Sequence, residues 1–374
     1  MKRIQYIINA LFGALLLLSW GCTGDFDEIN RNPSEATDEE LQRENYKIGT
    51  NIRGLQNLVI PVQEHRYQFN ESLTGNAFAG YMGETPDGWK EKFSTFNPSA
   101  DWLKWPFVIV MQEAYPYFRG VINNTDDEVA IALAKLFRVA IMHRMTDTYG
   151  PIPYSKVIED SAESLTVAYD TQEEVYMKMF EELDEVLAVL HANEQLSADA
   201  FRKFDYVYYG DILKWIKYAN SLKLRMAMRL SYVKPDVSQA KGAEAIADGV
   251  ITANADNAMM HAPENRTALI YNDWGDHRVA ADIISYMNGY NDPRREKMFT
   301  TVRLVENGQE VQGYAGIRIG INVSSKATAV SSYSNLLITG SDPYLWMNAA
   351  EVTFLRAEYE LRWGSAETAK TLYE

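Results

Sequence analysis

The stretch from Glu128 to Met145 constrains the fold more than any other part of the sequence. Nearly every position in it is apolar or alanine, including Val129, Ile131, Leu133, Leu136, Phe137, Val139 and Ile141. A helix that is apolar around most of its circumference must be buried on most sides. The chain therefore has to supply further helices that surround this one, and we expect a mostly α-helical fold.

Other segments show the helical period that such packing needs. Asp170 to Glu173 is a capping-box-like start, with Asp at the cap, and Asp211 caps a further helix. Their apolar seams are Val175, Met179, Leu183, Val186 and Leu190 in one helix, and Trp215, Ala219, Leu222, Met226 and Leu230 in the other. A last pair is expected from Glu351 to Trp363 and from Ser365 onwards, separated by Gly364. Helices joined by short breaks predict tetratricopeptide-like pairs.

The composition divides the chain into regions. Residues 46–250 and 341–374 carry the helical patterns and are predicted to form the scaffold, whereas residues 251–340 are rich in Gly, Asn, Ser and Asp. We expect this second region to be a loop-rich, ligand-binding excursion with little β structure. Its one strand-like piece, Tyr314 to Ile321, predicts at most a small sheet.

The N-terminus has the pattern of an export signal. Lys2 and Arg3 precede a short apolar run, and residues 1–21 end before Cys22, the single cysteine of the chain. This arrangement resembles a bacterial lipoprotein signal peptide, in which Cys22 would carry the lipid; a membrane-anchor helix with an incidental cysteine is the alternative. Residues 22–45 predict an acidic tether, either a surface-export signal or simply a solvated linker.

Charge and motifs exclude several classes of function. Acidic residues outnumber basic ones 51 to 36, for a formal charge of −15, so no nucleic-acid partner is expected. The sequence contains no P-loop, dinucleotide fingerprint or nucleophile elbow, and its five histidines lack metal-ligand spacing. We therefore expect no catalytic residue, metal or cofactor, although a two-carboxylate glycosidase stays open because spatial carboxylate distances are invisible in a sequence. Arg225 and Arg229 are interpreted as structural ties.

The aromatic residues suggest where a ligand would bind. Trp215, Trp346 and Trp363 fall in helical or helix-entry segments and are expected in the core. Another set lies in Gly/Pro/Asn-rich context and is predicted to contact ligand: Trp89, Trp102, Trp105 and Trp274, with Tyr81 and Tyr314 as supports. Flat rings with a polar rim suit sugars, and Asn272, Asp273 and Asp276 could accept hydroxyl hydrogen bonds beside Trp274. The alternative is that these rings only pin loops to the helices.

Four stretches together resemble one protein family. They run from Met145 to Tyr154 (MTDTYGPIPY), from Ala219 to Ser231, from Asn291 to Arg294 and from Asp342 to Glu358. In order, they are similar to the SusD/RagB family of nutrient-binding outer-membrane lipoproteins. The resemblance implies tetratricopeptide-like helix pairs, a loop-rich ligand-binding region and a TonB-dependent, SusC-like transporter as partner. It carries over no ligand residue.

Together with the resemblance, these observations predict a lipid-anchored, non-catalytic protein of the outer membrane that faces the cell exterior. We expect it to capture an oligosaccharide and deliver it to the transporter. A peptide ligand and, less favoured, a surface glycosidase are the alternatives. Because the last helix has no C-terminal cap after Leu372, we also expect a C-terminally truncated member of the family.

Overall fold

The computed structural model describes residues 46–159, 166–196 and 202–374. Residues 48–374 form one compact unit. The signal peptide, Cys22 and the acidic tether lie outside the described residues. None of the helices in the described ranges combines the length and the hydropathy needed to span a bilayer.

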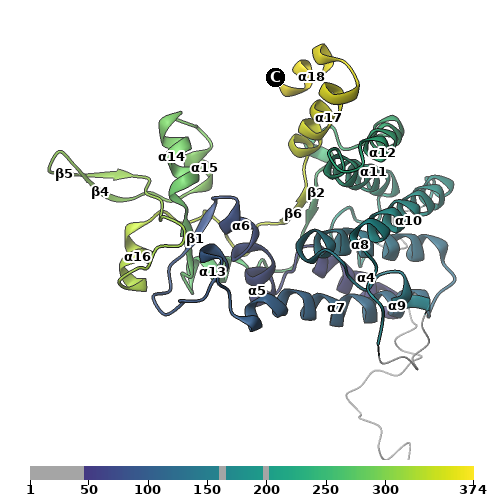
Figure 1. The fold of residues 1–374 in the computed structure, drawn as a ribbon, viewed down its shortest axis with the longest axis horizontal. Helices are drawn as coiled ribbons and strands as arrows, with labels where there is room; N and C mark the ends of the chain where they lie inside the picture. Colours follow the sequence, from purple (N-terminus) through teal and green to yellow (C-terminus); the bar gives the residue numbers. More distant parts are fainter. Residues whose placement is uncertain (1–45, 160–165, 197–201) are drawn as a thin grey trace, which may run out of the picture. The chain divides into compact units, whose positions relative to one another are not determined.

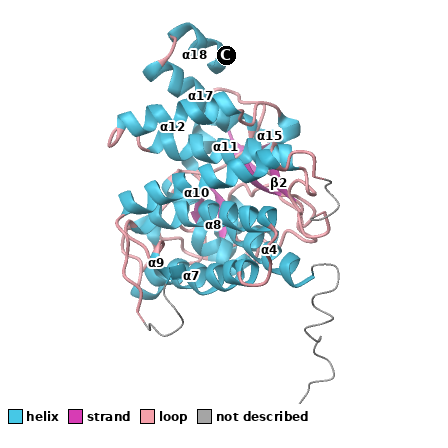
Figure 2. Cartoon of the chain, turned by 90° about the vertical axis from the view of Figure 1, so that its right-hand side faces the viewer, coloured by secondary structure: helices cyan, strands magenta, loops and turns pink. Residues whose placement is uncertain are grey.

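The compact unit is built mainly from long helices that pack in chain order. They are α4 (Tyr46–Val59), α7 (Ala100–Ile122), α8 (Glu128–Tyr149), α10 (Gln172–Ala192), α11 (Ile212–Arg229), α12 (Pro235–Asp248), α17 (Ala349–Trp363) and α18 (Ala366–Tyr373). Helix α7 packs on α8, α8 on α10, α10 on α11, and α11 on both α12 and α17. Figure 2 shows these helices one above another, from α7 to α18. The mostly α fold predicted from the sequence is confirmed.

Helix α8 lies at the centre of the main core. Its Leu136, Phe137 and Val139 are fully buried, as the apolar pattern predicts. Phe137 meets Trp215 edge to face, with ring centroids 5.1 Å apart, and Trp346 at 6.1 Å. Trp215 and Trp346 are thus core residues, and they hold α11 and a strand distant in sequence, β6 (Tyr344–Met347), against α8.

Two helix starts can be compared with their predicted caps. Asp211 caps α11 as expected, with its carboxylate accepting from Lys214 N at 3.2 Å. The cap of α10 is one residue later than predicted: Thr171 forms the capping box with Glu174. Asp170 instead accepts hydrogen bonds from the backbone of Tyr154 and Ser155, at 3.1 and 2.8 Å. Its carboxylate is used to hold the incoming loop, which leaves the cap to the neighbouring hydroxyl.

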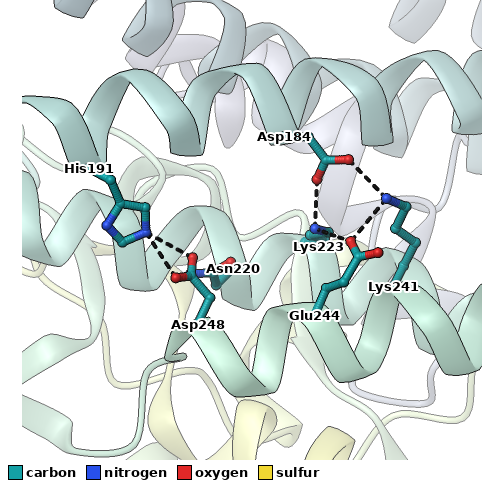
Figure 3. Close-up of polar contacts among 7 residues, drawn as sticks. All are labelled: Asp184, His191, Asn220, Lys223, Lys241, Glu244 and Asp248. Carbon is teal, nitrogen blue, oxygen red and sulfur yellow. Dashed lines mark hydrogen bonds and ion pairs between the residues drawn. The ribbon is translucent and has the colours of Figure 1, made fainter.

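Polar side chains join α10, α11 and α12 (Figure 3). Lys223 on α11 pairs with Asp184 on α10 and with Glu244 on α12, both at 2.6 Å. Lys241 contacts the same two carboxylates, at 2.9 and 3.0 Å. These ion pairs fix how the three helices lie against one another.

The segment between α12 and α17 is less regular, and Figure 1 shows its elements from α13 to α16 on the side of α5 and α6. It contains η5 (Asn254–Asp256), α13 (Ala268–Asn272), α14 (Ala281–Gly289), α15 (Arg295–Met298) and α16 (Lys326–Ser332). Strand β2 (Ala258–Met260) pairs with β6 (Tyr344–Met347), so the two ends of the segment meet. Strand β3 (His277–Val279) pairs with β1 (Met82–Glu84) and packs over a second, smaller core that includes Ile270, Ile284 and Phe299.

The prediction of a strand from Tyr314 to Ile321 is wrong. That piece forms only an isolated bridge between Ile317 and Ala280. The regular hairpin lies just before it, where β4 (Val302–Glu306) pairs with β5 (Gln309–Gly313). Its turn, Asn307-Gly308, has φ angles of 51° and 79°, the left-handed values that tight hairpins require of both residues.

Candidate functional site

A pocket of about 670 Å³ opens where four segments meet. These are the turn that follows α5 (Glu64–Tyr67) with the adjoining α6 (Gly75–Phe78), the loop before α7 with the start of α7, the end of α8, and the last residue of α11. Its lining is Phe69, Asn70, Glu71, Thr74, Gly75, Phe78, Phe93, Phe96, Pro98, Leu103, Pro106, Arg144, Asp147, Thr148, Tyr149 and Arg229. We call it the aromatic pocket, because phenylalanines dominate one side of it.

The first wall of the aromatic pocket is a π-helical turn, η2 (Gln68–Ser72). Its wider hydrogen bond runs from Leu73 N to Gln68 O, five residues back, at 2.9 Å. This turn carries Phe69, Asn70 and Glu71 into the lining. Single π-helical turns are uncommon and occur frequently at functional sites, so the turn marks this region independently of the pocket.

Phe96 forms the second wall in an unusual conformation. Its φ is +57°, a left-handed value that is rare for a bulky residue, and its side chain is 82% exposed. The ring stacks on that of Phe78, which is also exposed, with centroids 5.6 Å apart and planes 20° from parallel. A fold stabilises strained backbone only where surrounding contacts over-determine it, and such positions cluster at binding sites.

Trp102 supports the rings of the pocket from behind. Its indole meets Phe69 at 5.4 Å, Trp89 at 5.3 Å and Phe93 at 5.9 Å between centroids. Phe69 and Phe93 line the pocket, while the two tryptophans are half-buried and do not. The structure thus brings the predicted residues Trp89 and Trp102 together at this site, as the support of its lining.

Trp102 and Trp105 are helical, although their Gly/Pro/Asn-rich context is typical of a loop. Both lie in the first turns of α7, which begins after Ser99; the Ser99 hydroxyl accepts a hydrogen bond from Trp102 N at 3.4 Å. Proline is typical of loops because it interrupts helices, but Pro106 is accommodated inside α7. Trp105 is half-exposed and is not part of the pocket lining; it lies only two residues after the lining residue Leu103, so the two side chains leave α7 on different faces.

The other predicted residues lie near the second core. Trp274 packs against that core and tilts over His65, with ring centroids 4.7 Å apart. Tyr314 also packs there, beneath the guanidinium of Arg295 at 4.6 Å, and Tyr81 is half-exposed beside β1. None of the three is part of the aromatic-pocket lining.

Of the polar neighbours proposed for Trp274, Asp276 is unsuited to bind hydroxyls. Its carboxylate is buried and accepts hydrogen bonds from Gln68 at 2.9 Å and Lys326 at 2.5 Å. Asn272 is exposed but donates to the carbonyl of Ile338 at 2.9 Å. Asp273 is exposed and stays a candidate.

Two arginine–carboxylate pairs form the polar side of the aromatic pocket. Arg144 pairs with Glu71, and Arg229 pairs with Asp147 at 2.5 Å. Burial, with the neighbouring Arg225, lowers the pKa of Arg144 to about 10, so this guanidinium stays charged at neutral pH. Each carboxylate of the pocket lining is thus paired with an arginine. The side chain of Arg229 is half-exposed and lines the pocket.

Arg225 and His143 are structural, and for Arg225 the sequence predicted this. Arg225 binds Glu351 at 2.6 and 2.8 Å, which ties α11 to α17. Burial, helped by Arg225 and Arg229, lowers the pKa of His143 far below its ordinary value, so the imidazole is neutral. Among the described residues, no group of three or more His, Cys, Asp or Glu side chains could hold a metal ion.

The aromatic residues that line the pocket are not among those predicted from the sequence. They are Phe69, Phe78, Phe93, Phe96 and Tyr149, whereas the predicted ligand contacts are tryptophans and two tyrosines. The sequence contains a signal for them: Phe78 lies between Gly75 and Gly80, and Phe93 and Phe96 lie between Gly88 and Pro98, in the same context as Trp89. The meeting of four distant segments, however, has no local sequence signal.

The chain is similar to one described family and to several solved structures. The family model described as SusD-like, Susd and RagB outer membrane lipoprotein, matches residues 28–374. A SusD homologue from Bacteroides thetaiotaomicron is 53% identical, with a TM-score of 0.81, over 87% of this chain and 67% of that one. A SusD homologue from Bacteroides ovatus is 38% identical, with a TM-score of 0.80, over 88% and 68% of the two chains.

A third structure carries a description of its ligand. It is a chitin-binding SusD homologue from Flavobacterium johnsoniae, 33% identical, with a TM-score of 0.78, over 87% of this chain and 68% of that one. No curated protein matches the chain.

Proposed function

Because the chain belongs to the SusD/RagB family of outer-membrane lipoproteins, we propose that its aromatic pocket binds an oligosaccharide as part of nutrient uptake. The observation that carries this proposal is the exposed stack of Phe78 and Phe96, with Phe96 in a strained conformation. Sugar rings present an apolar face that packs on an aromatic ring and hydroxyls that need polar partners at the edge. The pocket offers both kinds of surface.

The size of the site favours several sugar units over one. The aromatic pocket has a volume of about 670 Å³, and a second pocket of about 560 Å³ shares Asp147 and Arg229 with it. An extended ligand could therefore pass over this ion pair and contact both. The chitin-binding homologue from Flavobacterium johnsoniae makes chitooligosaccharides the first ligands to try.

Binding without turnover is part of this proposal. Glycoside hydrolysis needs one carboxylic acid free to protonate the leaving oxygen and a second carboxylate across the bond. In the aromatic pocket Glu71 is held by Arg144 and Asp147 by Arg229, and Asp147 also accepts from the Tyr176 hydroxyl at 2.5 Å. Neither carboxylate is placed as a free general acid, so we expect the glycan to leave unchanged.

The test is to titrate the full chain, solubilised in detergent, with a panel of neutral oligosaccharides that includes chitooligosaccharides, and with peptides of matched length. Calorimetry measures affinity, and chromatography of the recovered ligand measures turnover. We expect affinity for at least one glycan and none for the peptides, with the glycan intact. Binding of peptides alone would contradict the proposal in favour of a peptide ligand, and cleaved glycan would make the protein an enzyme.

We further propose that the captured oligosaccharide passes to a SusC-like TonB-dependent transporter of the outer membrane. Family membership supports this partner, since the family is one of outer-membrane lipoproteins. The test is affinity purification of the tagged chain from detergent-solubilised outer membranes. Recovery of a TonB-dependent transporter in amounts close to those of the tagged chain is expected; its absence, with the chain itself recovered, would contradict the partnership.

A further inference from the structure

The loop between β1 and α7 carries the residues on which the proposed function depends. It contains Trp89, Phe93 and Phe96, and its residues 93, 96 and 98 line the aromatic pocket. Apart from the 3₁₀ turn η3 (Phe93–Thr95), the loop has no regular structure, so something other than a helix or sheet must fix its shape.

We propose that the buried ion pair between Lys92 and Glu84 is the positioning device of the aromatic pocket, holding the loop in the shape that presents Phe93 and Phe96 to ligand. Lys92 and Glu84 are then positioning residues that touch no ligand themselves. The proposal rests on the proposed function for its ligand, although the contacts that carry it are independent of any ligand.

The backbone of Lys92 organises the turn that leads to Phe96. Its carbonyl oxygen accepts hydrogen bonds from Thr95 N at 3.3 Å, Asn97 N at 3.3 Å and Thr95 Oγ1 at 3.2 Å. Within this turn, Phe96 N donates to Phe93 O at 2.9 Å. A displacement of Lys92 would therefore loosen the bonds that hold Phe96 in its left-handed conformation.

The side chain of Lys92 is anchored in the interior. It is only 3% exposed, and its Nζ lies 3.9 Å from Glu84 Oε2 and 3.4 Å from the carbonyl oxygen of Ile321. Glu84 is at the end of β1 and is 1% exposed; its Oε2 also accepts from Ser94 Oγ at 2.8 Å. One carboxylate thus holds the loop at two positions, Lys92 and Ser94.

The ion pair of Lys92 with Glu84 contributes little net free energy to folding. Burying two charges costs hydration that their attraction barely repays, and Glu84 Oε1 is buried without a hydrogen-bond partner among the described residues. An apolar pair would pack as well at lower cost. A charged pair, unlike an apolar one, holds the loop in one conformation. The left-handed backbone of Phe96 persists only if the residues around it are fixed in this way.

The segment around Gly320 backs the same loop. Gly320 has a φ of +77°, and a Cβ added there would lie 3.2 Å from Ser94 O. The neighbouring Ile321 supplies the carbonyl that Lys92 contacts. Ile317 N donates to Val279 O in β3 at 2.9 Å, and Ile317 O accepts from Ala281 N, at the start of α14, at 2.7 Å. One piece of the region predicted to bind ligand, residues 317–321, therefore lies against the loop that carries Phe93 and Phe96.

The experiment removes the charge at Lys92 and measures the loop directly. Lys92→Met keeps the apolar stem, and Ser94→Ala is a milder second variant should Lys92→Met fold poorly. Hydrogen exchange of the full chain in detergent, without ligand, should become on the order of tenfold faster in residues 85–98 and stay unchanged in α8. Lys92→Arg keeps the charge and should restore exchange close to the native rate.

Affinity for chitohexaose is the second readout. We expect the affinity to fall about tenfold or more in Lys92→Met and by less than about threefold in Lys92→Arg. Both values refer to the folded fraction of each variant, so that unfolding does not account for the loss. The matched control is Arg138→Met, which breaks the equally buried pair of Arg138 with Glu182, 2.6 Å apart in the helical scaffold. It should lower the melting temperature while leaving exchange in residues 85–98 and affinity unchanged.

The two proposals fail in different ways. If the native chain binds a glycan and Lys92→Met binds it equally well, the positioning role is overturned and the proposed function stands. If the native chain binds no glycan, the proposed function fails, and hydrogen exchange alone decides the inference. Native exchange rates for residues 85–98 in Lys92→Met and Ser94→Ala would then overturn it.

Discussion

Phe96 and Tyr209 have the same unusual backbone conformation in two different parts of the fold. Their φ angles are 57° and 54°, and each ring is exposed and stacked on another, Phe96 on Phe78 and Tyr209 on His261. Only Phe96 lines the aromatic pocket. The pair therefore allows the effect of strain to be separated from the effect of a lost ligand contact.

Phe96→Gly should weaken glycan binding about fivefold without lowering stability, because one aromatic contact contributes about 1 kcal/mol. Relief of the left-handed strain, about 1–3 kcal/mol, offsets the extra backbone freedom of glycine, about 0.5–1 kcal/mol. Calorimetric titration and thermal unfolding measure the two effects separately. Tyr209→Gly is the control and should leave affinity unchanged; a matching loss of affinity there would show that the pocket is not the site.

At the scale of secondary-structure elements, helix-to-helix ion pairs hold α10, α11 and α12 together (Figure 3). They differ in burial: the Lys223 side chain is 5% exposed, whereas that of Lys241 is 24% exposed. The same carboxylates, Asp184 and Glu244, therefore have one buried and one partly solvated partner. This difference makes the two lysines a matched pair for mutation.

Lys223→Met should lower the free energy of unfolding by about 1–3 kcal/mol, because it leaves two carboxylates between the helices with one cation. Lys241→Met should cost less than about 1 kcal/mol, since water already screens that ammonium and Lys223 stays in place. Urea unfolding measures both. Equal losses in the two variants would show that burial does not set the strength of these pairs.

His191 gives the same helices a pH dependence. Its ring contacts Asp248 at 2.9 Å and Glu194 at 2.6 Å, and hydrogen bonds first to Asp248 and then to Glu194 raise the pKa of His191 above its ordinary 6.5. A raised pKa in the folded state stabilises the fold below the unfolded-state pKa, and this contribution is lost as pH rises through the folded-state value.

His191→Gln should therefore be less stable than the native chain at about pH 5 and equally stable at about pH 9. The difference should stay below about 1 kcal/mol, because the ring is partly exposed and its ion pairs are screened. Thermal unfolding across this range measures it. His261→Gln, at an exposed histidine with no ion pair among the described residues, is the control; a pH-independent difference for His191→Gln would contradict the argument.

At the scale of the whole molecule, sequence reasoning succeeded where a pattern is local. The helices around α8 follow from the 3.6-residue period and the short breaks, and Trp215 is in the core as that period requires. Trp346 is in the core as expected, but it lies in strand β6 and not in a helix. Missed features depend on distant partners or on backbone detail. Thr171 caps α10 because the carboxylate of Asp170 is engaged by the backbone of Tyr154 and Ser155. The hairpin of β4 and β5 was not predicted, although Asn307-Gly308 is a typical hairpin turn.

The candidate site was predicted only in part, for the same reason. Trp89 and Trp102 are at the aromatic pocket, but they only support its lining. The rings of the lining come from the π-helical turn and from Phe96, whose backbone is left-handed. No period or motif encodes the meeting of η2, the Lys92 loop and the end of α8. The ion pair of Lys92 with Glu84 is likewise invisible until the fold brings the two residues together.

Membrane attachment is also a property of the whole molecule. Cys22 is the single cysteine and follows the apolar signal, so we predict that it carries the lipid. Cys22→Ser should move the protein from the detergent phase to the aqueous phase in a phase-partition assay, because the acyl chains are its anchor. Unchanged partitioning of the variant would contradict lipidation at this residue.

The measurement that tests the central claim most directly is a crystal structure of the chain with the oligosaccharide that binds it most tightly. The account predicts sugar density in the aromatic pocket, with one ring packed against Phe96 and Phe78 and hydroxyls near Arg229 and Asp147. Density at another surface, with this pocket empty at saturating ligand, would contradict it.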